Sequence, residues 1–303
     1  MSFFKYILSF LILQTFFLQA QPGDPNGTLD SLRFWKKKFS FGLNFNQASF
    51  SSNWKAGGVS SIGLNTGLVY KADYKKGKIK WDNEIDFLFG FVNSSGLGYQ
   101  KTQDRLYLDT KFGLDLNDKW SLFSALNLLS QFANGHHVVN DSTKNLISDF
   151  FAPAFITSTW GMEYMPVSYF KLRISPFSPR ITFVQDPQRF VATVAPNPYG
   201  VQPPSSYRTE WLAFQLLADF HKALSENVNL KWRYVLFANY ETFSLRTIDH
   251  RIDLQLSARI NKFLQMGMGG IFLYDFDQDP GAQISQMFTL GFLYSYQNYK
   301  EEK

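Results

Sequence analysis

Apolar and polar residues alternate along the chain from residue 39 to residue 296. Within residues 79–89, Trp81 and most other odd positions are apolar, whereas Lys80 and the other even positions are mostly charged. Successive side chains of a β-strand point to opposite faces, so a period of two predicts strands with one apolar and one polar face. Other clear cases are residues 106–116 and 250–260.

About twelve such segments are present, and each is near the roughly 9–11 residues that a tilted membrane strand needs. One apolar and one polar face on every strand fit a membrane barrel with lipid outside and a polar interior. The expected strands are residues 38–47, 59–74, 78–91, 103–116, 120–132, 150–165, 169–184, 209–221, 228–240, 248–260, 264–276 and 286–297.

The connections between these segments alternate between short and long. Outer-membrane barrels alternate short periplasmic turns with longer extracellular loops. The pattern therefore predicts an all-β protein, a single transmembrane antiparallel up-and-down β-barrel of about 12 strands with periplasmic N- and C-termini. The short connections are residues 75–77, 117–119, 166–168, 222–227 and 261–263, and the long ones are 48–58, 92–102, 133–149, 185–208, 241–247 and 277–285.

Composition agrees with a membrane barrel. Aromatic residues make up 18% of the chain, and phenylalanine alone supplies 32 residues. A lipid-facing barrel uses such side chains for its outer band and interfacial girdles. The net charge is +5, yet no run of basic residues is long enough to predict nucleic-acid binding. The chain has no cysteine, which excludes disulfides and thiol chemistry.

The N-terminus is typical of a secretory signal. Lys5 precedes an apolar run over residues 6–18, which is shorter than the ~20 residues a spanning helix needs. Export of a barrel places it in the outer membrane of a Gram-negative bacterium. The expected divisions are a signal peptide at residues 1–20, a periplasmic segment at 21–37, the barrel at 38–297 and a periplasmic tail at 298–303.

The last strand, residues 289–296, carries Gly291, Tyr294 and Tyr296 in an order that resembles the C-terminal insertion signal of outer-membrane barrels. The barrel-insertion machinery is therefore an expected partner during biogenesis, and outer-membrane lipid and lipopolysaccharide are expected around the folded barrel. As the closing strand it should pair with the first strand, because a barrel in lipid leaves no open edge.

Proline at 176 and 179 predicts that the seventh strand bends or ends early, because proline cannot donate a backbone hydrogen bond to the ladder.

Two loops are candidate lids or partner contacts. The long loop at 185–208 is rich in proline, which favours an ordered lid or an inward-folded constriction over a flexible tether. The candidate residues are Pro196, Pro198, Pro203 and Pro204 in this loop, and Trp54, Gly57 and Gly58 in the first long loop.

Charged residues on the polar strand faces are the main functional clue. The third and fourth strands carry an acidic side of the lumen, and the seventh and ninth strands carry a basic side, roughly opposite in a ring of twelve. Two interpretations are open: a transverse field across a wet lumen that orients dipolar solutes, or charges that neutralise one another in a plugged interior. The acidic side is Asp82, Glu84, Asp86, Asp109 and Asp115, and the basic side is Lys171, Arg173, Lys231 and Arg233.

No pattern predicts catalysis, a cofactor or a metal. His136 and His137 are adjacent, so in an extended segment they point to opposite sides and chelate poorly. Asp249 and His250 are also adjacent on one strand, so their side chains point to opposite faces. This argues against an Asp–His protease site at the barrel rim. The sequence has no His-x-Ser motif that would place both side chains on one strand face, as a lipase would need. It also has no phosphate-binding loop. An outer-membrane lipase or protease is therefore the least favoured function.

Residues 46–58, Asn-Gln-Ala-Ser-Phe-Ser-Ser-Asn-Trp-Lys-Ala-Gly-Gly, with Ile-Gly-Leu-Asn at 62–65, resemble the opening motif of an outer-membrane protein family of Bacteroidetes-type bacteria, known as a domain of unknown function. Residues 175–184 and 236–240 resemble its later landmarks. The resemblance implies a barrel and brings no substrate or catalytic residue.

The sequence thus favours a small restricted channel for polar or charged solutes, on the basis of its charged inward faces. The alternative is a non-enzymatic accessory subunit of an outer-membrane secretion, insertion or uptake complex, in contact with other outer-membrane proteins.

Overall fold

The computed structural model describes residues 34–49, 60–140 and 143–299. Residues 36–303 form one compact unit. The predicted signal peptide and Trp54, Gly57 and Gly58 lie outside the described residues. No helix in the described ranges is both long and apolar enough to cross a membrane.

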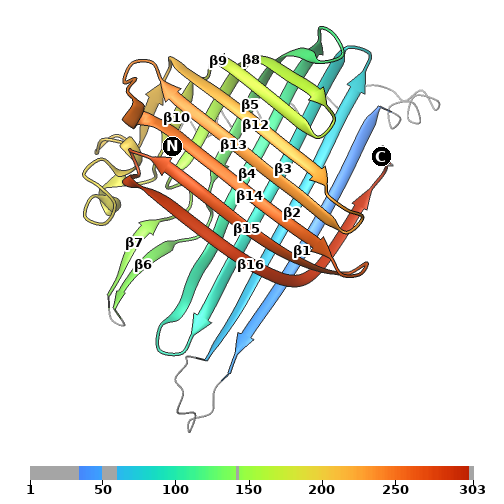
Figure 1. The fold of residues 1–303 in the computed structure, drawn as a ribbon. Coiled ribbons are helices and arrows are strands. Elements are labelled where there is room, and N and C mark those ends of the chain that lie inside the picture. Colours follow the sequence, from blue (N-terminus) through green and yellow to red (C-terminus); the bar gives the residue numbers. More distant parts are fainter. Residues whose placement is uncertain (1–33, 50–59, 141–142, 300–303) are drawn as a thin grey trace, which may run out of the picture. The chain divides into compact units, whose positions relative to one another are not determined.

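Twelve strands form an antiparallel ring, as the alternating pattern predicts (Figure 1). Their order around the ring is β8, β5, β4, β3, β2, β1, β16, β15, β14, β13, β12 and β9, and pairing of β9 with β8 completes it. The strands are β1 (Trp35–Ala48), β2 (Ser61–Lys76), β3 (Ile79–Ser94), β4 (Gly98–Asp115), β5 (Trp120–Ser130), β8 (Ala154–Val167), β9 (Phe170–Phe177), β12 (Ala213–Ala223), β13 (Val228–Asn239), β14 (Ile248–Arg259), β15 (Leu264–Asp275) and β16 (Asp279–Gln297).

The outer face of the ring is apolar, with exposed side chains such as Phe112, Leu122 and Leu254. Aromatic rings cluster next to the short turns, where Trp120 packs on Tyr164 with ring centroids 4.6 Å apart. Amphipathic rings prefer membrane interfaces. The clusters therefore agree with the predicted girdle at this end of the barrel.

The seventh predicted strand is broken at its prolines, as expected. β9 ends at Phe177, and β10 (Arg180–Phe183) continues along β8 after the break. A short strand, β11 (Tyr207–Glu210), pairs with β10 and precedes β12. The ring wall is thereby extended at the end where the long loops lie.

The proline-rich loop is ordered and packs on a hairpin, β6 (Gly135–Asn140) and β7 (Thr143–Ser148). Phe190 and Val201 of the loop are fully buried in a small apolar cluster with Ala152 and Val184. The Tyr199 hydroxyl donates to the Ile147 carbonyl oxygen at 2.5 Å, and burial raises the pKa of Tyr199 to about 12. The loop contains the 3₁₀ turns η1 (Pro187–Phe190) and η2 (Pro198–Gly200); a third, η3 (Leu245–Thr247), precedes β14.

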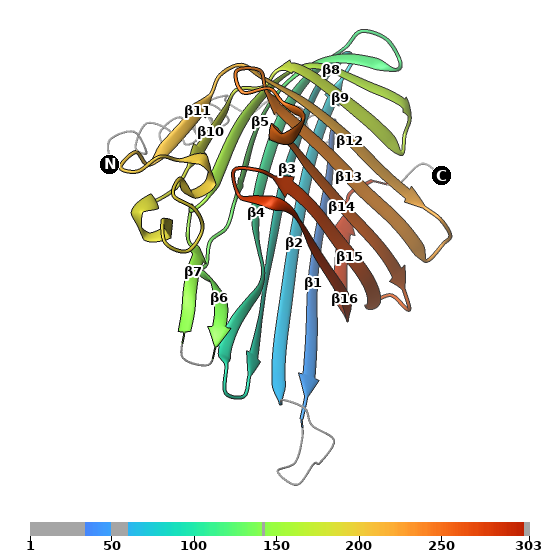
Figure 2. The same ribbon diagram turned by 60° about the vertical axis from the view of Figure 1, so that its left-hand side comes forward.

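An ordered lid and an inward-folded constriction were the two expected arrangements for this loop. In the structure the loop forms two 3₁₀ turns, and its apolar core lies against residues of β7 and the segment before β8. Pro198 is buried, Pro203 is half-buried, and Pro196 and Pro204 are exposed. The prolines therefore shape a rim structure at the long-loop end (Figure 2).

The ring closes where β16 pairs with β1, from Lys38 with Gln297 to Asn44 with Gly291. Gly291 has a steric reason to be glycine, since a Cβ there would collide with the Leu43 carbonyl oxygen and the Asn44 backbone. A backbone neighbour cannot rotate away as a side chain can. Gly291 is therefore needed for closure itself, beyond its place in the predicted insertion signal, while Tyr294 and Tyr296 face outward and are exposed.

We expect Gly291→Ala to lower the yield of folded barrel strongly on refolding into detergent, because β16 and β1 could not approach. The folded fraction is measured on a denaturing gel with unheated samples, as the share of protein that migrates at the faster position of the folded barrel. Gly269→Ala in β15 is the matched control, since its Cβ would meet only ordinary contact at 3.9 Å. Equal yields for the two variants would contradict the closure argument.

Candidate functional site: a charge network in the barrel lumen

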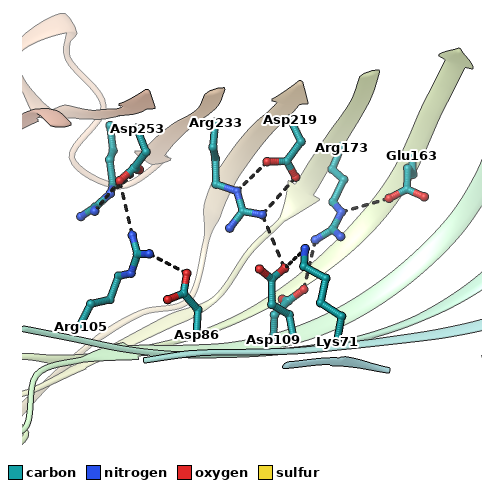
Figure 3. A network of polar contacts seen from close by, with 11 residues as sticks. Lys71, Asp86, Arg105, Asp109, Glu163, Arg173, Asp219, Arg233 and Asp253 are labelled. Atoms are coloured by element: carbon teal, nitrogen blue, oxygen red, sulfur yellow. Dashed lines mark hydrogen bonds and ion pairs between the residues drawn. The ribbon is translucent and has the colours of Figure 1, made fainter. Parts of the chain in front are cut away.

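Arg233 joins two walls of the barrel. It extends from β13, and its Nε donates to Asp219 Oδ1 on the adjacent β12 at 2.6 Å. Its terminal nitrogen lies 3.9 Å from Glu84 Oε2 on β3, which is not a ring neighbour of β13. Figure 3 shows this residue reaching from the β12–β13 wall toward the β3–β4 wall. The lumen is therefore crossed by a charged contact.

Two further arginines make crossings of the same kind (Figure 3). Arg173 of β9 lies 3.1 Å from Glu163 on β8 and 3.6 Å from Asp109 on β4. Arg105 of β4 lies 2.6 Å from Asp86 on β3 and 3.8 Å from β14 at Asp253 Oδ1. Each guanidinium thus has one acid from a neighbouring strand and one from a strand farther around the ring.

Lys111 is the most deeply buried charge in the lumen. Its side chain is 1% exposed, and its ammonium lies 2.6 Å from Glu163 and 2.9 Å from Asp82. Glu163 also binds Arg173, so one carboxylate links two cations. An ion as buried as this is stable only when it is paired. This part of the lumen is consequently filled by paired ionic side chains.

The predicted acidic and basic sides do face one another, and four members of the acidic side lie within the network. Asp115 instead binds Lys80 and Lys75 near the short turns. Lys171 and Lys231 take part in no ion pair within 4.0 Å among the described contacts, and Lys231 is exposed. The acids inside the network are Asp82, Glu84, Asp86 and Asp109, and the bases are Arg173 and Arg233.

The sequence pattern did not single out Glu163 and Asp219, although both neutralise the basic side. Asp219 is inward on β12, between the two basic strands, and Glu163 is inward on β8. The period of two in residues 150–165 and 209–221 places both on the polar face, so the signal was present. The basic side expected from the seventh and ninth strands is therefore partly neutralised by acids on the neighbouring strands β8 and β12.

The lumen is filled unevenly. On one side, inward residues of β5, β8, β9 and β12 are almost fully buried, among them Ala125, Thr159 and Ser175. On the other side, many inward positions are small, uncharged and accessible to solvent, although Lys38 and Lys71 also point inward there. The small positions include Ser40 and Gly42 of β1, Gly67 of β2, Gly267 and Gly269 of β15, and Ser285 and Thr289 of β16.

A second group of charges lies at the long-loop end. Arg180 of β10 lies 3.0 Å from Asp249 of β14 and stacks over the Phe237 ring at 3.3 Å. Arg208 of β11 contacts Asp277 in the loop between β15 and β16. These contacts tie the β10–β11 extension to the opposite part of the rim and narrow the entrance at that end.

The histidines do not form a reactive constellation. His250 lies on the outer face, where its Nδ1 is 2.8 Å from the Tyr234 hydroxyl. His136 and His137 are exposed on the β6–β7 hairpin. Within the part of the chain that the structure describes, no group of three or more His, Asp or Glu side chains is arranged to hold a metal ion.

Sequence comparison gives one partial match. The model of a family described as "Protein of unknown function (DUF3078)" matches residues 45–136. This span includes the opening motif at 46–58 and 62–65, whereas the landmarks at 175–184 and 236–240 lie beyond it. Comparison with curated proteins gives no significant match.

Three solved structures illustrate the structural similarity. An outer membrane channel from Pseudomonas putida F1 is 10% identical, with a TM-score of 0.41, over 92% of this chain and 100% of that chain. The NanC porin is 8% identical, with a TM-score of 0.41, over 84% and 98%. The translocator domain of the autotransporter NalP from Neisseria meningitidis is 7% identical, with a TM-score of 0.35, over 88% and 95%.

Proposed function

We propose that this protein is an outer-membrane channel that admits small polar or charged solutes through one side of its lumen. The observation that carries this proposal is the uneven filling of the ring. Packed ionic groups occupy the side of β4, β8 and β9, while most inward residues of β14, β15, β16, β1 and β2 stay accessible. Water and small solutes would follow the accessible side.

The two walls of this pathway differ in charge. The wall of β15, β16 and β1 is largely uncharged, with glycine, serine, threonine, asparagine and glutamine at most inward positions and Lys38 as a charged exception, whereas Arg233, Arg105 and Lys231 reach in from the other side. Charges on one wall of a narrow, low-dielectric passage raise the local concentration of counter-charged solutes and orient dipolar ones. A restricted channel with a preference for small polar solutes follows from this arrangement.

Planar-bilayer recording tests the channel. Purified, refolded protein should give small, discrete conductance steps, and it should make liposomes permeable to small polar solutes while retaining larger ones. Boiled protein in the same detergent is the control. Refolded protein that gives neither steps nor flux would overturn the proposal.

An accessory role in an outer-membrane complex is the second candidate, and the rim structure favours it. The loop packs on the β6–β7 hairpin through Phe190 and Val201, and Arg189 lies 3.0 Å from Asp149. An ordered rim of this kind suits a contact with another outer-membrane protein, as compact surface loops often do. A mild-detergent pull-down that returns only the barrel would count against this role.

We expect Phe190→Ala to make the rim loop sensitive to limited proteolysis while the barrel itself stays folded. The phenyl ring is fully buried, and its loss leaves a cavity worth about 3–5 kcal/mol in a packed core. Tyr207→Ala is the control, because that ring is 58% exposed. Cleavage of both variants at the same rate would show that the small core does not hold the loop.

A further inference from the structure

The seam that closes the ring is only partly paired. Hydrogen-bonded pairing of β16 with β1 covers Gly291–Gln297 and stops at Asn44 on β1. The remaining part of β16, residues 279–290, pairs with β15 alone. Figure 1 shows β16 bending at the point where it leaves β1. Among the described residues, nothing pairs with the other edge of residues 279–290.

This free segment of β16 is exposed on both faces. Ile284 and Phe288 on the outer face are 78% and 65% exposed, and Ser285 on the inner face is also exposed. On the far side of the seam, β1 continues to Ala48 beyond the last pair with β16. Two strand edges therefore flank the same opening in the barrel wall.

An unpaired strand edge is unfavourable in a membrane. Backbone N–H and C=O groups have no water to bind in the hydrocarbon region, so lipid-exposed sheet edges do not occur there. In water such an edge recruits extended peptides, which add a strand through main-chain hydrogen bonds. The edge of residues 279–290 therefore requires a strand beside it in the membrane.

We infer that residues 279–290 of β16 and the end of β1 form a docking site for an extended segment of another protein, which enters the barrel wall as an additional β-strand. The flanking residues define the segment. Its outer face must be apolar beside Ile284, Phe288 and Leu290, and its inner face must be small or polar beside Ser285 and Thr289.

A single inserted strand fits the opening better than a second copy of this chain. The opening has a free edge on each side, and one strand can pair with both. A second barrel that paired through its own β16 would satisfy the β16 edge and leave the β1 edge unpaired. The inference is independent of the proposed conduction, because it concerns the wall of the barrel and not its lumen.

The first experiment asks whether the chain closes its own seam, using cysteine pairs in a protein that has no native cysteine. If the pairing of β1 with β16 continued in the same register, Asn46 would lie opposite Thr289. Disulfide formation in the Asn46→Cys/Thr289→Cys variant therefore reports pairing along the whole seam. Ser40→Cys/Ser295→Cys is the control, because those residues are paired and their hydroxyls lie 3.2 Å apart. In liposomes the control pair should oxidise readily and the test pair several-fold less. Equal oxidation would overturn the inference.

The second experiment supplies a strand. The probe is a synthetic peptide with the sequence of residues 39–48 and cysteine in place of Asn44, which has the required alternation. It should form a disulfide with a Ser285→Cys barrel several-fold more than with a Gln255→Cys barrel, whose lumen-facing cysteine lies in fully paired β14. A peptide of scrambled order should not discriminate between the two.

Three outcomes of this second experiment would overturn the inference: equal adduct at both sites, no adduct at Ser285→Cys, or barrel-to-barrel disulfides of Ser285→Cys without peptide, which would assign the edge to a second copy. None of these outcomes depends on conductance. Failure of the docking site and failure of the proposed channel are therefore distinguishable.

Discussion

Replacing Lys111 with methionine should destabilise the barrel by about 3–5 kcal/mol, because the change takes one of two cations from the buried Glu163 carboxylate and the close cation from Asp82. The Lys111 side chain is 1% exposed and holds Glu163 at 2.6 Å and Asp82 at 2.9 Å. Methionine keeps most of the length and apolar volume of the stem. The loss therefore comes chiefly from the charge.

Urea unfolding of the protein in detergent micelles or liposomes, followed by tryptophan fluorescence, measures this difference. Lys75→Met is the matched control, because Lys75 makes a 3.4 Å ion pair with Asp115 but its side chain is 64% exposed. Exposed ion pairs contribute about 0–1 kcal/mol. Equal destabilisation by the two variants would show that the buried cluster contributes no more than a surface pair.

Replacing Arg233 with alanine should increase single-channel conductance and shift ion selectivity toward cations. The guanidinium spans the lumen between Asp219 and Glu84, so its removal widens the passage and leaves both carboxylates without that cation. An excess of acidic groups in the lumen concentrates cations in a narrow pore. The two effects should appear together.

Conductance and reversal potential in a salt gradient measure both effects in one recording. Arg251→Ala is the control, because Arg251 is also an inward arginine but binds Asp253 on its own strand at 2.7 Å and makes no crossing among the described ion pairs. It should change selectivity slightly and conductance little. The network would not be the constriction if Arg251→Ala opened the pore as much as Arg233→Ala.

The strands of this protein are predictable because the period of two repeats over long segments. Predicted and observed strands agree closely for β3, β13, β14 and β15. Apart from the broken seventh strand, the largest differences are at β4 and β16, which begin at Gly98 and Asp279, several residues before the alternation becomes clear. Their first residues extend by pairing with β3 and β15, and neighbours on the adjacent strand decide that extension.

The break at Ser178 and Pro179 was foreseeable because proline cannot donate to a ladder. The pairing beyond the break was not foreseeable. β10 continues the pairing of β9 with β8, from Phe177 opposite Trp160 to Arg180 opposite Thr157. β11 likewise continues the pairing of β12 with β9, so both strands are interrupted and keep their neighbours. A propensity scale does not show this shared register, because it depends on strands that are distant in the sequence.

The sequence by itself determined that twelve segments form strands and which side chains face inward, since both follow from alternation along one strand. It also placed Asp109 and Arg173 on facing walls. Only the tertiary structure decided that these charges meet through Glu163 and Asp219, that one half of the lumen is packed while the other is accessible, and that β16 leaves β1 at Gly291. The physical reason is strand register. Contacts across a ring depend on the combined stagger of all twelve strands, and the sequence of one strand does not determine that stagger.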